Sequence, residues 1–253
     1  MEVSKRALLG TIAALLVLFV VGILGKWEAE NGNDCFIRHS LRETAAKAEK
    51  SAGENTTGNT TENTAEYMEI KRIALTFDDG PHPSYTEKLL DGLKERGVRA
   101  TFFVTGEHAE LHPDIVRRMS KEGHLIGNHT YSHIQLTAGN RETFKEELRR
   151  TNEVITKITG NEVLYVRPPY GSWDKAFEKE LNMLPVLWSV DPLDWCCNDA
   201  ACVTRKVVKA VSENDIILLH DYYASSVEAA LMIVDTLQEE GYEFVTVEEL
   251  LLD

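Results

Sequence analysis

The chain has 253 residues, 43% of them hydrophobic and 27% charged, so it has room for one globular domain of moderate size with additional segments. Its formal net charge is −14, and most of the acidic excess lies after residue 70. An acidic domain without a basic stripe lacks the cationic surface that nucleic-acid binding requires, so we expect no nucleic-acid partner.

The first 25 residues predict a cytoplasmic N-terminus and a membrane anchor. Residues 7–25 form an uncharged run rich in Leu, Val, Ile and Ala, preceded by Lys5 and Arg6. A helix rises about 1.5 Å per residue, so this run can cross a hydrocarbon core of roughly 30 Å. A cleaved signal peptide is the alternative, in which case the rest of the chain would be secreted. No A-x-A-like cleavage site follows the run, so we favour an uncleaved signal anchor. Basic residues before it place the remaining chain outside the cytoplasm.

Residues 26–69 predict a flexible linker. Residues 55–64 consist only of Asn, Thr, Gly and Glu. Such a composition buries too little apolar surface to offset the entropy lost on ordering. We therefore expect the folded domain to be residues 70–253.

From residue 70 onward, short apolar runs alternate with helical patterns. The predicted helices span residues 85–96, 140–159 and 225–240, and each is followed by a glycine. Most apolar runs are continuous, which is typical of parallel strands covered on both faces. The alternation indicates right-handed βαβ units and a parallel α/β sheet, either an incomplete barrel or an open doubly wound sheet. The predicted strands are residues 73–77, 100–104, 124–127, 164–166, 186–190, 216–219 and 244–247.

Five polar clusters follow predicted strands. They are Thr76-Phe77-Asp78-Asp79-Gly80, His129-Thr130-Tyr131-Ser132-His133, Arg167-Pro168-Pro169-Tyr170-Gly171, Asp191-Pro192-Leu193-Asp194-Trp195 and Leu218-Leu219-His220-Asp221. Parallel α/β sheets bind ligands at the C-terminal edge of their strands, so the clusters should converge on one face. Together they supply a carboxylate and two imidazoles for one divalent metal, a second carboxylate as base and a third imidazole as acid. This set predicts a metal-dependent hydrolase.

The order and residues of these clusters resemble the NodB-type polysaccharide deacetylases, carbohydrate esterases that remove N- or O-acetyl groups from sugars. The resemblance covers all five clusters and runs from about residue 70 to the C-terminus. It implies an α/β fold, an irregular seven-stranded (β/α) barrel, preceded in this chain by the transmembrane helix and the flexible tether.

The first two clusters predict a metal site. His129 and His133 are four residues apart, which is one helical turn and lets both rings point the same way. Asp79 offers a third ligand, although Asp-Gly-Pro after a strand is also common turn chemistry. Two imidazoles and one carboxylate leave positions open for water and substrate, as in catalytic zinc sites. We expect Zn²⁺, and Co²⁺, Mn²⁺ or Fe²⁺ would also suit these ligands.

The resemblance implies roles around that metal. Asp79 would be the ligand and Asp78 the general base that accepts a proton from the metal-bound water. Arg167 would pair with Asp78, favour its charged form and fix its orientation, the alternative being a solvated surface arginine. Pro169 would stiffen the turn, and a backbone N–H near Tyr170 would help to hold the oxyanion.

The resemblance assigns His220 to protonate the leaving nitrogen or oxygen. Asp194 would orient this ring and raise its pKa, with Asp191 as the second candidate. Leu218 and Trp195 would line a small apolar pocket for the acetyl methyl group, or would only pack in the core.

The remaining histidines and cysteines have no comparable context. We expect the histidines to be structural or surface residues: His82, His108, His112 and His124. An extracytoplasmic chain permits one disulfide between Cys202 and either Cys196 or Cys197, and three free thiols are the alternative.

These predictions describe a monomeric, membrane-anchored, metal-dependent deacetylase outside the cytoplasm, acting on an acetylated glycan. Peptidoglycan, at N-acetylglucosamine or N-acetylmuramic acid, is the first choice, because the anchor and linker would hold the domain near a cell wall. Chitin oligosaccharides and acetylxylan are alternative substrates of the same reaction class. A metal hydrolase that cleaves a different amide is a further alternative. A glycan-binding pseudoenzyme is the alternative of another class, although such proteins typically lose a residue that this chain keeps.

Overall fold

The computed structural model describes residues 71–252, which belong to one compact unit, Glu66–Asp253. The predicted anchor and linker lie outside the described residues. Within residues 71–252, no helix combines the length and the apolar character needed to cross a membrane.

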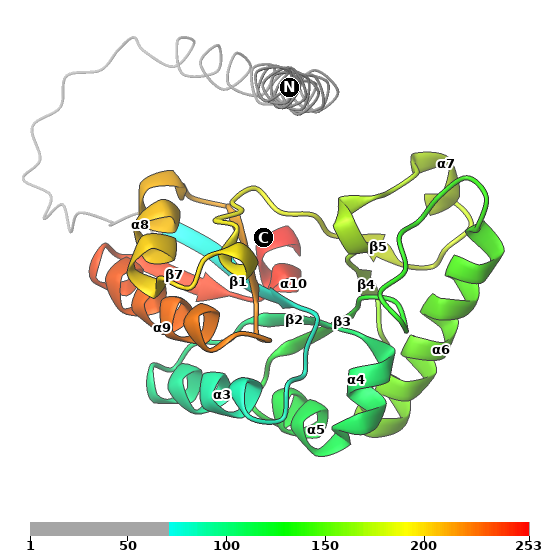
Figure 1. Cartoon of the computed structure of the whole chain (residues 1–253), viewed down its shortest axis with the longest axis horizontal. Helices are drawn as coiled ribbons and strands as arrows, with labels where there is room; N and C mark the ends of the chain where they lie inside the picture. The colour runs from blue at the N-terminus through cyan, green and yellow to red at the C-terminus, as the bar shows by residue number, and fades with distance from the viewer. Residues whose placement is uncertain (1–70, 253) are drawn as a thin grey trace, which may run out of the picture. The chain divides into compact units, whose positions relative to one another are not determined.

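Seven strands form one curled sheet in the order β5-β4-β3-β2-β1-β6, with β7 paired to the beginning of β1 (Figure 1). The strands are β1 (Lys71–Asp78), β2 (Thr101–Val104), β3 (Leu125–Asn128), β4 (Tyr165–Val166), β5 (Leu184–Pro185), β6 (Ile216–His220) and β7 (Tyr242–Val245). Every pairing between them is parallel. Their C-terminal ends therefore share one edge, as the alternation of apolar runs and helical patterns predicts.

Helices connect the strands and cover the sheet (Figure 1). They are α3 (Tyr85–Glu95), α4 (Gly106–Leu111), α5 (Pro113–Lys121), α6 (Arg141–Thr159), α7 (Lys175–Glu178), α8 (Ala200–Ala210), α9 (Ala224–Glu239) and α10 (Val247–Leu252). The three predicted helices agree with α3, α6 and α9 within one residue at each end. Sequence periodicity missed α4, α5, α7, α8 and α10, none of which is longer than α3. The predicted strand 244–247 is shifted, because α10 already begins at Val247.

The two faces of β1 show how the sheet organises the molecule. Leu75 and Phe77 point outward into the main core, to which α3, α5, α6, α8 and α9 contribute. Ala74 points inward, into a smaller core that includes residues of β2, β4 and α10. Because side chains alternate along a strand, Thr76 and Asp78 share the inner face with Ala74. The inner face thus carries polar residues as β1 approaches its C-terminal end.

The structure corrects the strand predicted at residues 186–190. The fifth strand is Leu184–Pro185, and Val190 forms only an isolated bridge to β6. The amide of Val186 donates to a carbonyl of β4 at 2.8 Å, whereas the carbonyl of Val190 accepts from an amide of β6 at 2.9 Å. The segment crosses from one side of the curl to the other, so it cannot pair with one neighbour along its length. The sheet is therefore a half-barrel rather than a closed barrel.

Candidate active site

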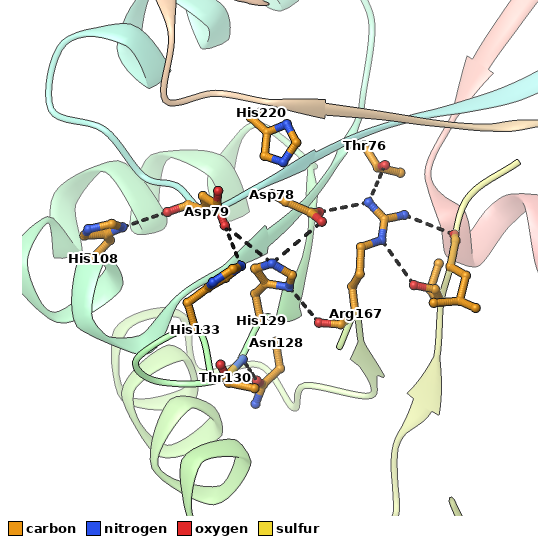
Figure 2. Close-up of polar contacts among 12 residues, drawn as sticks. Thr76, Asp78, Asp79, His108, Asn128, His129, Thr130, His133, Arg167 and His220 are labelled. Carbon is orange, nitrogen blue, oxygen red and sulfur yellow. Dashed lines mark hydrogen bonds and ion pairs between the residues drawn. The ribbon is translucent and has the colours of Figure 1, made fainter. Parts of the chain in front are cut away.

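Side chains from β1, β4 and β6 meet at the C-terminal edge of the sheet (Figure 2). Asp78 ends β1, His220 ends β6, and the two are partners in the register of the strands. Arg167 directly follows β4. All three lie on the inner face of the curl because they share the alternation of their strands. Residues 89 and 142 positions apart in the chain are thereby brought together without any local sequence relation.

Within the described residues, Asp79, His129 and His133 form a group that could hold a metal ion, with their ligand atoms all within 4.8 Å of one another. Oδ1 of Asp79 lies 3.2 Å from Nε2 of His133 and 3.5 Å from Nε2 of His129 (Figure 2). This is the set that the first two clusters predict.

The donor set fits a divalent cation. Oδ1 of Asp79 is buried and makes no hydrogen bond, although two imidazole nitrogens lie nearby. Burial opposes the charge of Asp79, but its contacts with His129 and the positive charges of the neighbouring rings outweigh burial and hold its pKa at about 2. Burial also lowers the pKa of His133, which favours the neutral ring that a metal requires. Unsatisfied, converging ligand atoms are what a cation between them would satisfy.

The loop that carries the two histidines is not helical, contrary to the helical-turn interpretation of their spacing. Thr130 and His133 adopt φ angles of 62° and 57°, in the left-handed region. The side chain of Asn128 holds this conformation, since its Oδ1 accepts from the amide of Thr130 at 2.8 Å. Its Nδ2 donates to the carbonyl of Leu148 at 2.8 Å, which ties the loop to α6. The two rings therefore converge through a tight turn. Asn128, which holds this turn, carries no motif that would mark it in the sequence.

His129 is oriented by the backbone of Arg167. Nδ1 of His129 lies 2.6 Å from the carbonyl oxygen of Arg167. A hydrogen on Nδ1 donates to this carbonyl and leaves the lone pair of Nε2 directed at Asp79. Such a contact fixes the tautomer of a ligating histidine. The backbone of the third polar cluster, at Arg167, thus orients a histidine of the second cluster.

The backbone of Asp79 is held from the opposite side. Asp79 has a φ of 73°, and its carbonyl lies 2.7 Å from Nδ1 of His108. His108, predicted to be a structural or surface residue, therefore contacts the backbone of a candidate ligand. The one sequence signal for this contact is its place four residues after β2, at the same edge of the sheet.

Arg167 and Asp78 form a buried ion pair. Nη1 of Arg167 donates to Oδ1 of Asp78 at 2.9 Å, and the two side chains are 0% and 4% exposed. The alternative of a solvated surface arginine is therefore wrong. Oδ2 of Asp78 lies 3.7 Å from Nε2 of His129, a candidate metal ligand. One oxygen of this carboxylate is thus held by the guanidinium, and the other faces the candidate metal ligands.

Asp194 holds His220 through two contacts. Its Oδ1 lies 2.8 Å from Nδ1 of the ring, and its Oδ2 accepts from the backbone amide of His220 at 2.8 Å. Burial lowers the pKa of His220, but the hydrogen bond and the charge of Asp194, followed by the charges of Asp78 and Asp79, raise it to about 9. Asp191, the second candidate for this role, instead accepts from the amide of Leu193 at 2.8 Å.

The expected pocket residues differ in their exposure. Leu218 and Pro169 are buried, whereas the side chains of Tyr170 and Trp195 are 68% and 54% exposed. Tyr170 has a φ of 61°, and its ring lies edge-on to His133, with ring centroids 4.9 Å apart. Both aromatic side chains are therefore exposed rather than packed in the core, and Tyr170 lies beside a candidate metal ligand.

The three cysteines after the fourth cluster are free thiols. Sγ of Cys196 points to the carbonyl of Leu193 at 3.2 Å, and Sγ of Cys197 to the carbonyl of Asp199 at 3.7 Å. The alternative without a disulfide is thus the one observed among these residues.

Known proteins are similar to this chain in sequence. The model of the family described as "Polysaccharide deacetylase" matches residues 65–187. Similar curated proteins include the peptidoglycan-N-acetylmuramic acid deacetylase PdaC of Bacillus subtilis and the peptidoglycan-N-acetylglucosamine deacetylase PgdA of Listeria monocytogenes. Each is 39% identical over 180 residues, which is 71% of this chain. The match covers 38% of PdaC and 39% of PgdA, so the chain spans well under half the length of these relatives.

Solved structures are similar in fold. The structure of Bacillus subtilis PdaC aligns with a TM-score of 0.70 at 39% identity, over 72% of this chain and 90% of that one. A family 4 acetyl xylan esterase from Clostridium thermocellum, in complex with a cobalt ion, aligns with a TM-score of 0.67 at 34% identity, over 71% of this chain and 90% of that one.

Proposed function

We propose that this chain, which belongs to the polysaccharide deacetylase family, is a metal-dependent enzyme that removes N-acetyl groups from the amino sugars of peptidoglycan. The observation that supports it most is the meeting of three groups at one edge of the sheet. These are the Asp79–His129–His133 ligand set, the Asp78–Arg167 pair and the Asp194–His220 pair. Pseudoenzymes typically lose one of these groups, and this chain has all three.

The arrangement supports a division of labour between base and acid. A divalent cation held by Asp79, His129 and His133 would act as a Lewis acid that polarises the acetyl carbonyl and makes water more acidic. Oδ2 of Asp78 is free to accept the proton of the attacking water, since Arg167 holds only Oδ1. His220 is protonated at neutral pH because its pKa is about 9, and its Nε2 can donate to the leaving nitrogen.

The exposed aromatic side chains near the site support a glycan as the substrate. Exposed aromatic side chains beside a polar site bury the apolar faces of sugar rings while leaving their hydroxyls solvated. Tyr170 is exposed beside the ring of His133, and the exposed Trp195 directly follows Asp194 in the chain. PdaC and PgdA are named for deacetylating different sugars of peptidoglycan, and each is 39% identical to this chain. The identity of the sugar is therefore a part of the proposal that needs its own experiment.

Acetate release by the purified, metal-loaded chain should be measured on peptidoglycan, chitin oligosaccharides and acetylxylan in parallel. We expect the largest rate on peptidoglycan. Muramidase digestion followed by mass spectrometry then shows whether glucosamine or muramic acid carries the free amine. His112→Ala is the matched control for the ligand variant His133→Ala, because His112 does not belong to the Asp79–His129–His133 group. Full metal content without acetate release from any of the three substrates would contradict the proposal and favour a pseudoenzyme.

We also propose that Zn²⁺ is the bound metal, that the enzyme is a monomer and that residues 7–25 anchor it in the cell membrane with the catalytic domain outside the cytoplasm. The ligand set supports the metal, and the apolar run in the sequence supports the anchor. Elemental analysis, sedimentation velocity and membrane fractionation with protease accessibility test them in turn. A chain recovered intact in the culture medium would contradict the anchor.

A further inference from the structure

We propose that Thr76 is a positioning residue for this reaction, because its hydroxyl fixes the direction in which Arg167 faces Asp78. The inference rests on the proposed function, since it concerns the same base. Thr76 lies two residues before Asp78 on β1 and is 0% exposed. Alternation along the strand puts both side chains on the inner face of the curl.

The hydroxyl of Thr76 has a fixed direction. Its Oγ1 donates to the carbonyl of Ile217 at 2.7 Å, on the neighbouring strand β6. A hydroxyl has one hydrogen, so this bond commits it and leaves only lone pairs for other partners. Nη1 of Arg167 donates to the same oxygen at 2.7 Å (Figure 2). Thr76 therefore acts toward the guanidinium purely as an acceptor, and β6 sets its orientation.

The other bonds of Arg167 hold a different edge of the guanidinium. Nε donates to the carbonyl of Val186 at 3.1 Å, and Nη2 donates to the carbonyl of Leu187 at 3.2 Å. Both acceptors belong to the segment that crosses the open side of the half-barrel. Nη1 carries the remaining two bonds, to Thr76 and to Asp78. Because the guanidinium is planar and rigid, anchoring Nη1 at Thr76 directs its second hydrogen at the carboxylate.

Removal of the hydroxyl leaves this edge without its neutral acceptor. Arg167 is 0% exposed, so water does not replace the lost partner. The ring of Phe103 lies 4.2 Å from the guanidinium carbon and offers no oxygen. A buried N–H without an acceptor is strongly unfavourable, so the guanidinium should turn and its bond to Asp78 should lengthen. The base then loses the contact that fixes which of its oxygens faces the water.

Three variants separate positioning from stability. Thr76→Val keeps the shape of the side chain without the hydroxyl, and Thr76→Ser keeps the hydroxyl. Thr101→Val is the matched control, because Thr101 is the register partner of Thr76 on β2 and is also 0% exposed. Its hydroxyl accepts from the amide of Val247 at 3.0 Å, away from Arg167. Thr76→Ala replaces Thr76→Val if the latter does not fold.

Crystal structures of the metal-loaded variants give a readout that needs no turnover. In Thr76→Val we expect Nη1 of Arg167 to move beyond hydrogen-bonding distance of Oδ1 of Asp78, and in Thr76→Ser and Thr101→Val to remain bonded. A bond that persists in Thr76→Val overturns the inference, whether or not the parent releases acetate. A parent that releases none counts only against the proposed function, so the two failures are distinguishable.

Kinetics show whether the position serves the reaction. On the substrate that the parent deacetylates, Thr76→Val should lose about ten- to a hundredfold in kcat, as is usual for residues that orient catalytic groups, with KM and metal content unchanged. Thr76→Ser should restore most of the rate. A loss of kcat in Thr101→Val as large as in Thr76→Val would show a general effect of destabilisation and would overturn the positioning role.

Discussion

Asp78 and Asp79 are adjacent in the chain, yet the molecule holds them in different ways. Asp78 is the last residue of β1, with a side chain 4% exposed and one oxygen bonded to Arg167. Asp79 is the first residue of a loop, with a φ of 73° and a side chain 31% exposed. Its backbone is held by His108, and its Oδ1 makes no hydrogen bond. The proposed base belongs to the interior of the sheet, and the candidate metal ligand belongs to a loop at its edge.

The same difference separates the rest of the site. Arg167 and His220 stand at strand ends inside the curl, whereas His133 and Tyr170 lie in loops with positive φ. Strand-end groups are set by the core, so a change there should affect turnover and stability together. Loop groups lie outside the core, so a change there should affect the site with little effect on the fold.

The largest effect is expected at a loop ligand. His133→Ala should lose the bound metal, because two remaining ligands hold zinc poorly, and acetate release should fall to background. The side chain of His133 is 32% exposed, so the thermal stability of the metal-free variant should match that of the metal-free parent. Elemental analysis, acetate release and thermal unfolding measure the three quantities. Full metal content in the variant would contradict its assignment as a ligand, and His112→Ala controls for the loss of a histidine.

The base should give the second largest effect. Asp78→Asn should lower kcat by about two to four orders of magnitude, the usual range for a general base, while metal content stays unchanged. The variant also leaves the charge of buried Arg167 without its partner, so it should unfold at lower temperature than the parent. Asp114→Asn is the control, since its side chain is 90% exposed and pairs only with a surface arginine. Near-normal turnover in Asp78→Asn would keep the enzyme and remove this base.

The acid should respond to pH. His220 must be protonated to act, and its pKa of about 9 means that the rate should fall as pH rises toward that value. A cation bound by Asp79 opposes the contribution of the two nearby carboxylates, so this limb lies at or below pH 9. Asp194→Asn removes the main group that raises the pKa, so the limb should move toward the ordinary value of about 6.5, and at pH 8 the rate should fall roughly tenfold or more.

Asp191→Asn is the matched control for the acid. Its amide oxygen can still accept from the amide of Leu193, so the alkaline limb should stay in place. Rate profiles from pH 6 to 10 with constant metal content decide between the two aspartates. A limb that moves in Asp191→Asn and not in Asp194→Asn would reverse their roles.

The division also explains what the sequence could predict. Alternation of apolar runs and helical patterns predicts the parallel sheet, and the placement of the polar clusters predicts which edge holds the site. The clusters that carry Asp78, Arg167 and His220 could be placed at this edge because each follows a predicted strand, whereas the roles of these residues came from the family resemblance. The convergence of the two histidines was predicted from the wrong geometry. Their loop depends on positive φ at Thr130 and on the side chain of Asn128, which no periodicity encodes.

Other parts of the site depend on contacts between distant segments. His108 reaches the carbonyl of Asp79 across 29 positions, and Thr76 reaches Arg167 across 91. Neither residue type is unusual for its element, so only the three-dimensional arrangement identifies the contact. The strand predicted at 186–190 failed for a related reason, because its ends are bonded to strands on different sides of the curl.

Asp221 lies where the two regions meet. It follows His220 at the end of β6 and is 0% exposed. Its carboxylate packs under the Asp79 loop so closely that a Cβ on Gly80 would overlap it. The hydroxyl of Thr86 contacts Oδ2, and Oδ1 makes no hydrogen bond. Burial raises the pKa of Asp221 to about 7, against the opposing effect of Thr86.

The ionisation of Asp221 should have the smallest effect on turnover. It should, however, change the stability of the fold. An unfolded aspartate titrates near 3.9, so between about pH 4 and pH 7 the unfolded chain has released this proton while the folded domain keeps it. The contribution of this group to the free energy of unfolding is therefore present below about pH 4. This contribution, on the order of a few kcal/mol, is lost as the pH rises through about 7. The carboxyl carbon resonance of Asp221 in the metal-free protein should titrate near pH 7. Thr86→Val should raise that midpoint, because it removes the hydroxyl that favours the charged form. A midpoint below 5 in the parent would contradict this expectation, because it would show that water reaches the carboxylate of Asp221 beneath Gly80.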